Sequence, residues 1–104
     1  MARFDVYVHP DVALRKKTPY LLDVQNNFLD ALESRIVIPM RHAVGFGPRM
    51  RDLHPEFQVA GKAVVLDTAA LGAFPAGNLV RPVQSLAQNQ SEILSALDAL
   101  FGGY

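Results

Sequence analysis

The sequence contains no cysteine, no hydrophobic run of membrane-spanning length and no excess of charge of either sign. Without cysteine the fold can hold neither a disulfide nor a cysteine-ligated zinc ion, and the composition suits a reducing compartment. No apolar run approaches the roughly 18 residues that a membrane-spanning helix needs. Charged residues interrupt the apolar pattern of residues 1–9, so this end does not resemble a signal peptide. We therefore expect a soluble, cytoplasmic protein.

Ten basic residues balance ten acidic residues, and half of the 104 residues are hydrophobic. A protein that binds nucleic acid usually has a basic excess or a concentrated basic patch, so the overall charge argues against that class. The length suits one domain, residues 1–104, with a core that needs no covalent staple.

Short β-strands dominate the first two thirds of the chain. Alternation of apolar and polar residues predicts a half-buried strand over residues 4–9, and β-branched residues predict another over residues 35–40. Pro39 cannot donate a ladder hydrogen bond, so we expect it at a bulge, a strand end or a sheet edge. The remaining strand candidates are residues 20–25, 57–59, 63–66 and a short piece at 79–80.

The connections carry turn-forming residues. Gly61 lies between two predicted strands and favours a hairpin there. Residues 43–48 form a loop with two glycines and a proline, without the spacing of a phosphate-binding motif. Residues 68–75 fit either a short helical turn or an irregular return.

The C-terminal stretch has the periodicity of a helix with one buried face. Ile93, Leu97 and Leu100 recur at spacings of three and four, Ala96 and Phe101 widen this stripe, and Val83 and Leu86 extend it backwards. Possible capping boxes at Ser85 and Asn89 place the helix start between residues 82 and 89. Short strands followed by one helix predict a mainly β fold, an antiparallel sheet or barrel with the C-terminal helix packed on it.

Catalytic patterns are absent from the sequence. His9, His42 and His54 are not spaced for a metal site, and we expect each at the surface or a sheet edge. No serine lies in a nucleophile-elbow sequence, and nothing in the sequence selects a carboxylate pair for acid–base chemistry. We therefore expect neither catalytic residues nor a metal or other cofactor.

The order of several short segments resembles the CcdB family of toxins from bacterial toxin–antitoxin modules. The matching segments are Phe4-Asp-Val-Tyr7, Leu22-Asp-Val-Gln25, Ile36-Val-Ile-Pro39, Asp52-Leu-His-Pro55 and Ala96-Leu-Asp-Ala-Leu-Phe101 with the following Gly103. The resemblance implies an SH3-like antiparallel barrel with a long C-terminal helix, assembled as a homodimer. It also implies a protein that is no enzyme but binds the A subunit of DNA gyrase and traps the cleaved-DNA complex. A disordered segment of a cognate antitoxin would neutralise it, folding as it binds.

The resemblance also assigns site residues. The implied gyrase-binding residues are an apolar pair, the exposed helix face and the tail: Phe28, Leu29, Ser91, Leu94, Ser95, Asp98, Phe101, Gly102, Gly103 and Tyr104. For the antitoxin it implies the first loop and a groove beside residues 66 and 67, that is His9, Asp11, Leu66 and Asp67. It implies neither direct binding of DNA nor a membrane role.

The tail departs from the family pattern. The family usually has tryptophan where Gly102 stands and a branched aliphatic residue where Tyr104 stands. Loss of a large aromatic anchor commonly costs about 2 kcal/mol or more of binding free energy, although Tyr104 supplies an aromatic ring two positions later. One alternative is therefore a protein that keeps the fold and the antitoxin but has lost gyrase poisoning. Another is an endoribonuclease toxin of the same fold, using Arg41, His42, Arg49 and Arg51.

Overall fold

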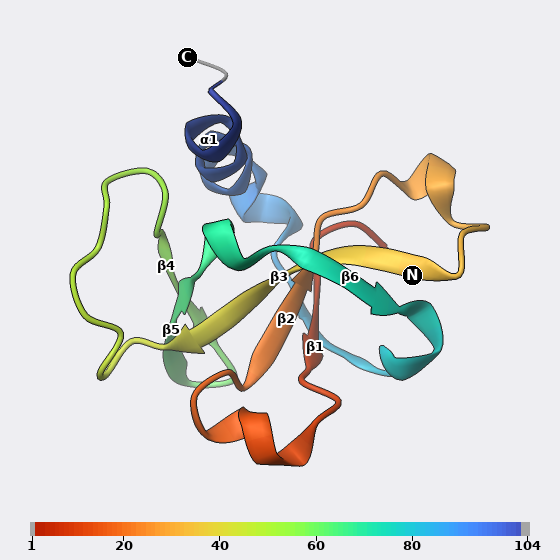
Figure 1. Ribbon diagram of the computed structural model, residues 1–104, viewed down its shortest axis with the longest axis horizontal. Helices are drawn as coiled ribbons and strands as arrows, with labels where there is room; N and C mark the ends of the chain where they lie inside the picture. Colours follow the sequence, from red (N-terminus) through yellow and green to blue (C-terminus); the bar gives the residue numbers. More distant parts are fainter. Residues whose placement is uncertain (1, 103–104) are drawn as a thin grey trace.

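The computed structural model describes residues 2–102 and consists of a curled antiparallel sheet with one C-terminal α-helix (Figure 1). In this part of the chain the sheet order is β4-β5-β3-β2-β1-β7, with β6 paired to β3. The helix covers one open end of the curled sheet, as expected from the sequence. The strands are β1 (Asp5–Val8), β2 (Tyr20–Asp23), β3 (Ser34–His42), β4 (Glu56–Val59), β5 (Lys62–Leu66), β6 (Gly72–Pro75) and β7 (Pro82–Ser85), and the helix is α1 (Gln90–Phe101).

The central strands are buried on both faces. In β2, Leu22 faces the main core under α1, while Leu21 joins a smaller cluster with Tyr7 and Leu79. The prediction of a half-buried first strand was therefore wrong, because the segment after β6 covers the outer face around Tyr7. A strand that is covered on both sides can place apolar residues at consecutive positions.

Strand β3 changes its partner halfway along. Its first half pairs with β6 and its second half with β5, while β2 runs along the other side. Pro39 lies between the two halves, after the pair Val37–Gly72 and before the pair Met40–Leu66. The missing N–H of proline thus falls where neither partner strand needs it. Pro39 therefore lies neither at a strand end nor on a free edge, but at the point in β3 where the partner strand changes from β6 to β5.

The connection after β5 corrects the prediction in three places. Residues 72–75 form a strand, preceded by a single 3-10 turn at Thr68–Ala70. Leu79 and Val80 are not in a strand, whereas Pro82–Ser85 pairs with β1. Val83 belongs to this strand and not to the helical stripe, and α1 starts at Gln90 after the 3-10 turn Ala87–Asn89. The helical periodicity wrongly included Val83 because β7 ends only five residues before α1 begins, and apolar residues of the strand happen to continue the helical spacing.

The hairpin between β4 and β5 has a two-residue turn. Ala60 and Gly61 both have positive φ, 50° and 78°, which matches the right-handed twist of the two strands. Beside this turn, Gln84 of β7 accepts a hydrogen bond from the Ala60 N–H (3.3 Å) and donates one to the Gln58 carbonyl (3.1 Å). One side-chain amide thus links the two end strands of the sheet.

Candidate functional site

Helix α1 divides its residues between the core and the surface. Ile93 and Ala96 are buried against the sheet, and Leu97 packs at the edge of the core. Leu94 and Asp98 are exposed, and so is Phe101, whose side chain is 71 % exposed. Phe101 therefore does not widen the buried stripe as the periodicity predicted. It ends the helix as an exposed ring.

Gly102 ends the helix in the left-handed conformation, with φ 77°. Its N–H donates to the Asp98 carbonyl, which satisfies one of the free carbonyls at the helix end. A glycine adopts this φ with little strain, and tryptophan would not. Gly103 and Tyr104, both expected at the gyrase site, lie outside the described residues.

The pair Phe28-Leu29 sits on a well-held 3-10 turn, Asn27–Leu29. The Asn26 side chain accepts from the Phe28 N–H (2.9 Å), and the Gln25 amide donates to the Leu29 carbonyl (3.1 Å). The Phe28 side chain is nevertheless 95 % exposed. The backbone is thus fixed while the ring extends into solvent, which is the arrangement of a binding anchor more than of a core residue.

An apolar hollow of about 390 Å³ joins this turn to the end of α1. Leu29 lines it from the turn and Phe101 from the helix, although the two residues are far apart in the sequence. The floor comes from the sheet and the β5–β6 connection. We call the hollow and Phe28 the apolar face; the hollow is lined by Val24, Gln25, Asn26, Leu29, Ile36, Leu71, Leu97 and Phe101.

The polar residues expected on the helix lie along a neighbouring surface. Ser91 and Ser95 line a separate shallow depression together with Glu92 and Asp52. The structure thus brings Leu29 and Phe101 together in one hollow, and it places Ser91 and Ser95 beside the loop before β4. Sequence reasoning missed Ile36 and Leu71 as walls of the hollow, because only the fold brings the start of β3 and the segment before β6 next to the end of α1.

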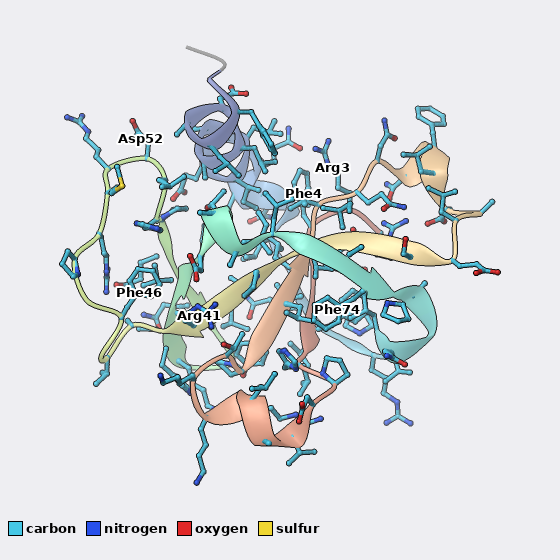
Figure 2. The ribbon with its side chains drawn as sticks, viewed as in Figure 1. Arg3, Phe4, Arg41, Phe46, Asp52 and Phe74 are labelled. Atoms are coloured by element: carbon cyan, nitrogen blue, oxygen red, sulfur yellow. The ribbon has the colours of Figure 1, made fainter. Side chains whose placement is uncertain are left out.

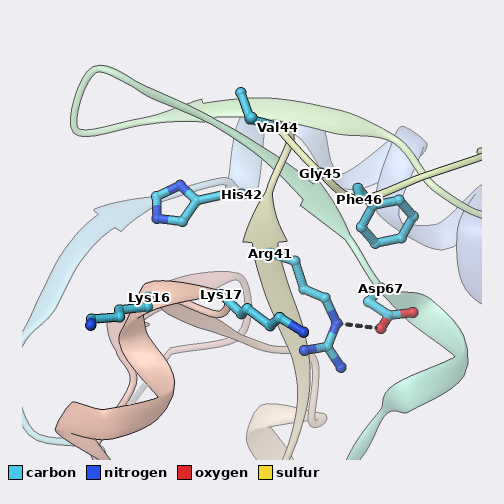
Figure 3. Close-up of a pocket in the computed structure, with 8 residues that line it drawn as sticks. All are labelled: Lys16, Lys17, Arg41, His42, Val44, Gly45, Phe46 and Asp67. Carbon is cyan, nitrogen blue, oxygen red and sulfur yellow. Dashed lines mark hydrogen bonds and ion pairs between the residues drawn. The ribbon is translucent and has the colours of Figure 1, made fainter.

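A third depression, of about 400 Å³, lies between the first loop and the end of β3 (Figure 3). We call it the basic groove; it is lined by Lys16, Lys17, Arg41, His42, Val44, Gly45, Phe46 and Asp67. Arg41 pairs with Asp67 through its Nε and donates from Nη1 to the Thr18 hydroxyl (2.6 Å). Neither Lys16 nor Lys17 forms an ion pair with any described residue. The groove therefore carries unpaired positive charge beside the apolar side chains of residues 44 and 46.

The four residues expected to contact an antitoxin differ in accessibility. Asp11 is exposed and caps the 3-10 turn Val12–Lys16 by accepting from the Ala13 N–H (3.0 Å). Asp67 lines the basic groove, but Leu66 is fully buried in the core and offers no contact surface. His9 is only 5 % exposed, so the expectation of a surface histidine was wrong. The groove was expected beside residues 66 and 67, and its cations come from residues 16 and 17.

A buried ion pair lies inside the sheet, next to Gln25 and Ile36, which line the apolar hollow. The Arg35 guanidinium contacts the Asp23 carboxylate at 2.7 and 2.9 Å, and both side chains are almost fully buried. Burial raises the pKa of Asp23, while hydrogen bonds from Arg35 and the Gln25 N–H oppose the rise. Arg35 also pairs with Asp30 (2.7 Å), so this cluster fixes the chain on either side of the exposed Phe28 turn.

The residues proposed for RNA cleavage do not gather at one place. Arg41 and His42 line the basic groove, whereas Arg49 pairs with Glu56 and does not line it, nor does Arg51. Among residues 2–102, no three histidine or acidic side chains lie close enough to hold a metal ion. Within the same range, no helix has the length and apolar character needed to cross a bilayer.

The described residues thus form a small, mostly β protein with an apolar hollow at the end of its C-terminal helix and a basic groove beside its first loop. The CcdB protein family matches residues 3–103, which is essentially the whole chain. The chain therefore belongs to the CcdB family, and this membership indicates a toxin of a toxin–antitoxin module. A search of curated proteins returned no match to the chain.

Proposed function

We propose that this protein is a bacterial cytoplasmic toxin that binds the A subunit of DNA gyrase through its apolar face and stabilises the cleaved-DNA complex. The observation that carries the proposal is the meeting of Leu29 and Phe101 in one hollow beside the exposed Phe28. Aromatic residues on a rigid backbone are the typical energetic anchors of a protein interface. The protein acts by binding and not as an enzyme.

Phe28 and Phe101 take over the anchoring role that the family usually gives to a tryptophan at the position of Gly102. They are the two most exposed phenylalanine side chains among the described residues, 95 % and 71 % exposed. The protein is proposed to act as a homodimer because it belongs to the CcdB family, whose resemblance implied that assembly.

The antitoxin is proposed to bind the basic groove with an acidic, extended segment. Lys16 and Lys17 supply charge without an ion-pair partner in the described structure, and Val44 and Phe46 supply apolar contacts. Complementary charge speeds association and selects the partner. The groove and the apolar face are formed by different residues, so the two partners use different surfaces.

The test is plasmid linearisation by purified gyrase in the presence of the protein. We expect linear DNA with the native chain and little with Phe28→Ser, because the anchor is lost while the backbone bonds of the turn remain. Leu32→Ser, at another exposed apolar residue outside the hollow, is the matched control and is expected to behave like the native chain. Absence of linear DNA with the native protein would refute gyrase poisoning.

The second candidate is a protein that binds the antitoxin but no longer poisons gyrase. The glycine at position 102 favours it, because the large aromatic anchor that the family usually has there is missing. Retained binding to a small protein encoded by the neighbouring gene, without toxicity or gyrase binding, would support this candidate. Deletion of Tyr104 separates the two candidates further. If linear DNA is lost on deletion, the tail takes part in gyrase poisoning, which supports the first candidate.

A further inference from the structure

His9 is a buried histidine at the root of the first loop. It follows directly after β1, is 5 % exposed, and meets the ring of Phe74 edge-on with centroids 5.6 Å apart. The backbone N–H of His9 donates to the Pro19 carbonyl (2.9 Å), which fixes the backbone of His9 beside the residue that precedes β2. None of the functions proposed above uses the imidazole.

The imidazole accepts a hydrogen bond that holds the loop. Nδ1 of His9 accepts from the Asp11 N–H at 3.0 Å. An accepting Nδ1 carries no proton, so the neutral ring has its proton on Nε2. The His9 carbonyl also accepts from Nε of Arg15 (2.7 Å). His9 thus binds the loop at its beginning, through Asp11, and near its end, through Arg15.

The same loop ends in the wall of the basic groove. Lys16 and Lys17 line the groove, and the Lys17 carbonyl accepts from the His42 N–H (3.0 Å). Asp11 caps the turn Val12–Lys16, which positions these lysines. The position of the groove's free cations therefore depends on a turn whose cap is held by His9.

We propose that His9 is a proton-operated latch: binding of a proton at Nδ1 breaks the bond to the Asp11 N–H and releases the segment of residues 10–17 from the wall of the basic groove. The protonated Nδ1–H of His9 then faces the Asp11 N–H, and two donors cannot form a hydrogen bond with each other. The consequence for a partner rests on the antitoxin role proposed above, since a released wall makes binding in the groove dependent on pH. The latch itself requires no partner.

The charges around His9 determine the pH at which the latch opens. Burial lowers the pKa of His9, the Asp11 carboxylate opposes this shift, and the guanidinium groups of Arg15 and Arg41 add to it. Asp11 belongs to the loop, Arg15 to its 3-10 turn and Arg41 to β3; Phe74 of β6, on the other side, carries no charge. The Asp11 carboxylate already accepts from the Ala13 N–H, so turning it toward a charged imidazole would uncap the turn.

The test is hydrogen exchange of the Asp11 amide, followed by NMR and corrected for intrinsic exchange, at about pH 7.5 and about pH 5. The protection of this amide in the native chain is expected to fall about fivefold or more at the lower pH, the factor that corresponds to one hydrogen bond of about 1 kcal/mol. In His9→Asn the Oδ1 atom occupies the place of Nδ1 and cannot be protonated in this range, so protection is expected to stay constant.

His54→Asn is the matched control. Nδ1 of His54 accepts from the Met50 N–H (2.9 Å) in the long loop between β3 and β4, so the change is chemically identical and lies elsewhere. This variant is expected to keep the pH response of Asp11. Constant protection of Asp11 in the native chain, at a pH where NMR shows His9 to be protonated, would overturn the proposal. So would an equal loss of protection in His9→Asn. Neither measurement uses an antitoxin, so failure of the latch and failure of the antitoxin role are distinguished.

Discussion

At the scale of single residues, Arg35 organises more of the molecule than its place in the sequence indicates. Its guanidinium contacts Asp23 and Asp30 and lies near the Gln25 carbonyl (3.5 Å). No buried side-chain polar atom among the described residues lacks a hydrogen-bond partner. A buried charge with all its partners is stable, and the same charge without one is costly.

Arg35→Met is expected to lower the free energy of unfolding by about 3–5 kcal/mol, because it leaves the Asp23 carboxylate buried without a counter-charge. Urea denaturation measures this loss. Arg81→Met, at an exposed position, is the control and should change stability by less than about 0.5 kcal/mol. A loss in Arg35→Met as small as that of the control would mean that the buried pair contributes nothing net.

His9 makes stability depend on pH. Its pKa is lowered in the folded state, so below about pH 6.5 the unfolded chain binds more protons than the folded chain. The contribution of His9 to stability is thus fully present above that pH and is lost as the pH falls through it. We expect the stability of His9→Asn to depend less on pH in this range. The variant should also be less stable by a constant amount at every pH, because it loses the contact with Phe74. Thermal unfolding measured across the pH range tests both expectations.

At the scale of elements, the turn between β4 and β5 uses an unfavourable residue. Ala60 has φ 50°, a conformation that costs an alanine about 1–2 kcal/mol, whereas asparagine tolerates it. Ala60→Asn creates Asn-Gly, the preferred pair for this turn, and should raise the urea midpoint. Gly61→Ala should lower it: φ is 78°, and nothing lies within 4 Å of the added Cβ, so the effect isolates backbone strain. Equal midpoints for both variants would contradict this account.

Gln84 connects the end strands β4 and β7 without a backbone ladder between them. Gln84→Ala removes both side-chain hydrogen bonds and is expected to cost about 1 kcal/mol, with faster hydrogen exchange at the Ala60 amide. Gln58→Ala is the control, because only the backbone carbonyl of Gln58 takes part. If the Ala60 amide exchanges equally fast in the two variants, the Gln84 side chain does not hold β4 and β7 together.

At the scale of the whole molecule, the apolar face and the basic groove are built from different residues, most of them in the loops and the helix that surround the sheet. The first lies at the end of α1, and the second lies between the first loop and the end of β3 (Figures 1 and 3). Figure 2 labels two residues of the basic groove, Arg41 and Phe46, which lie at the end of β3 and in the loop that follows it. Zero net charge thus conceals a local basic site.

The two surfaces should be separable by mutation. Phe28→Ser is expected to weaken gyrase binding about tenfold or more, the effect of losing an interface anchor, and to leave antitoxin binding intact. Replacing both Lys16 and Lys17 by glutamate should reverse this pattern by repelling an acidic segment. Calorimetry with purified gyrase and with the antitoxin measures both affinities. Parallel loss of both affinities in either variant would show that the surfaces are coupled.

Local patterns predicted much of the fold from particular residues. Alternation predicted the strand at β1, β-branched residues predicted β3, and Gly61 marked the hairpin. The prediction failed at β6 and β7, where glycine, proline and alanine give no periodic signal and strand formation depends on pairing with β3 and β1. For the candidate site, the resemblance named the apolar pair, the helix end and the first loop up to residue 17. It did not name Ile36 and Leu71, since only folding brings them to the end of α1.

Residues close together in the chain were enough to predict β1 to β5, the C-terminal helix and the family. Only the tertiary structure decided that Phe101 is exposed, that Arg35 and His9 are buried, and that Leu29 shares a hollow with Phe101. The physical reason is that periodicity specifies which face of an element is apolar. What covers that face, and which distant side chain meets it, depends on how the sheet curls.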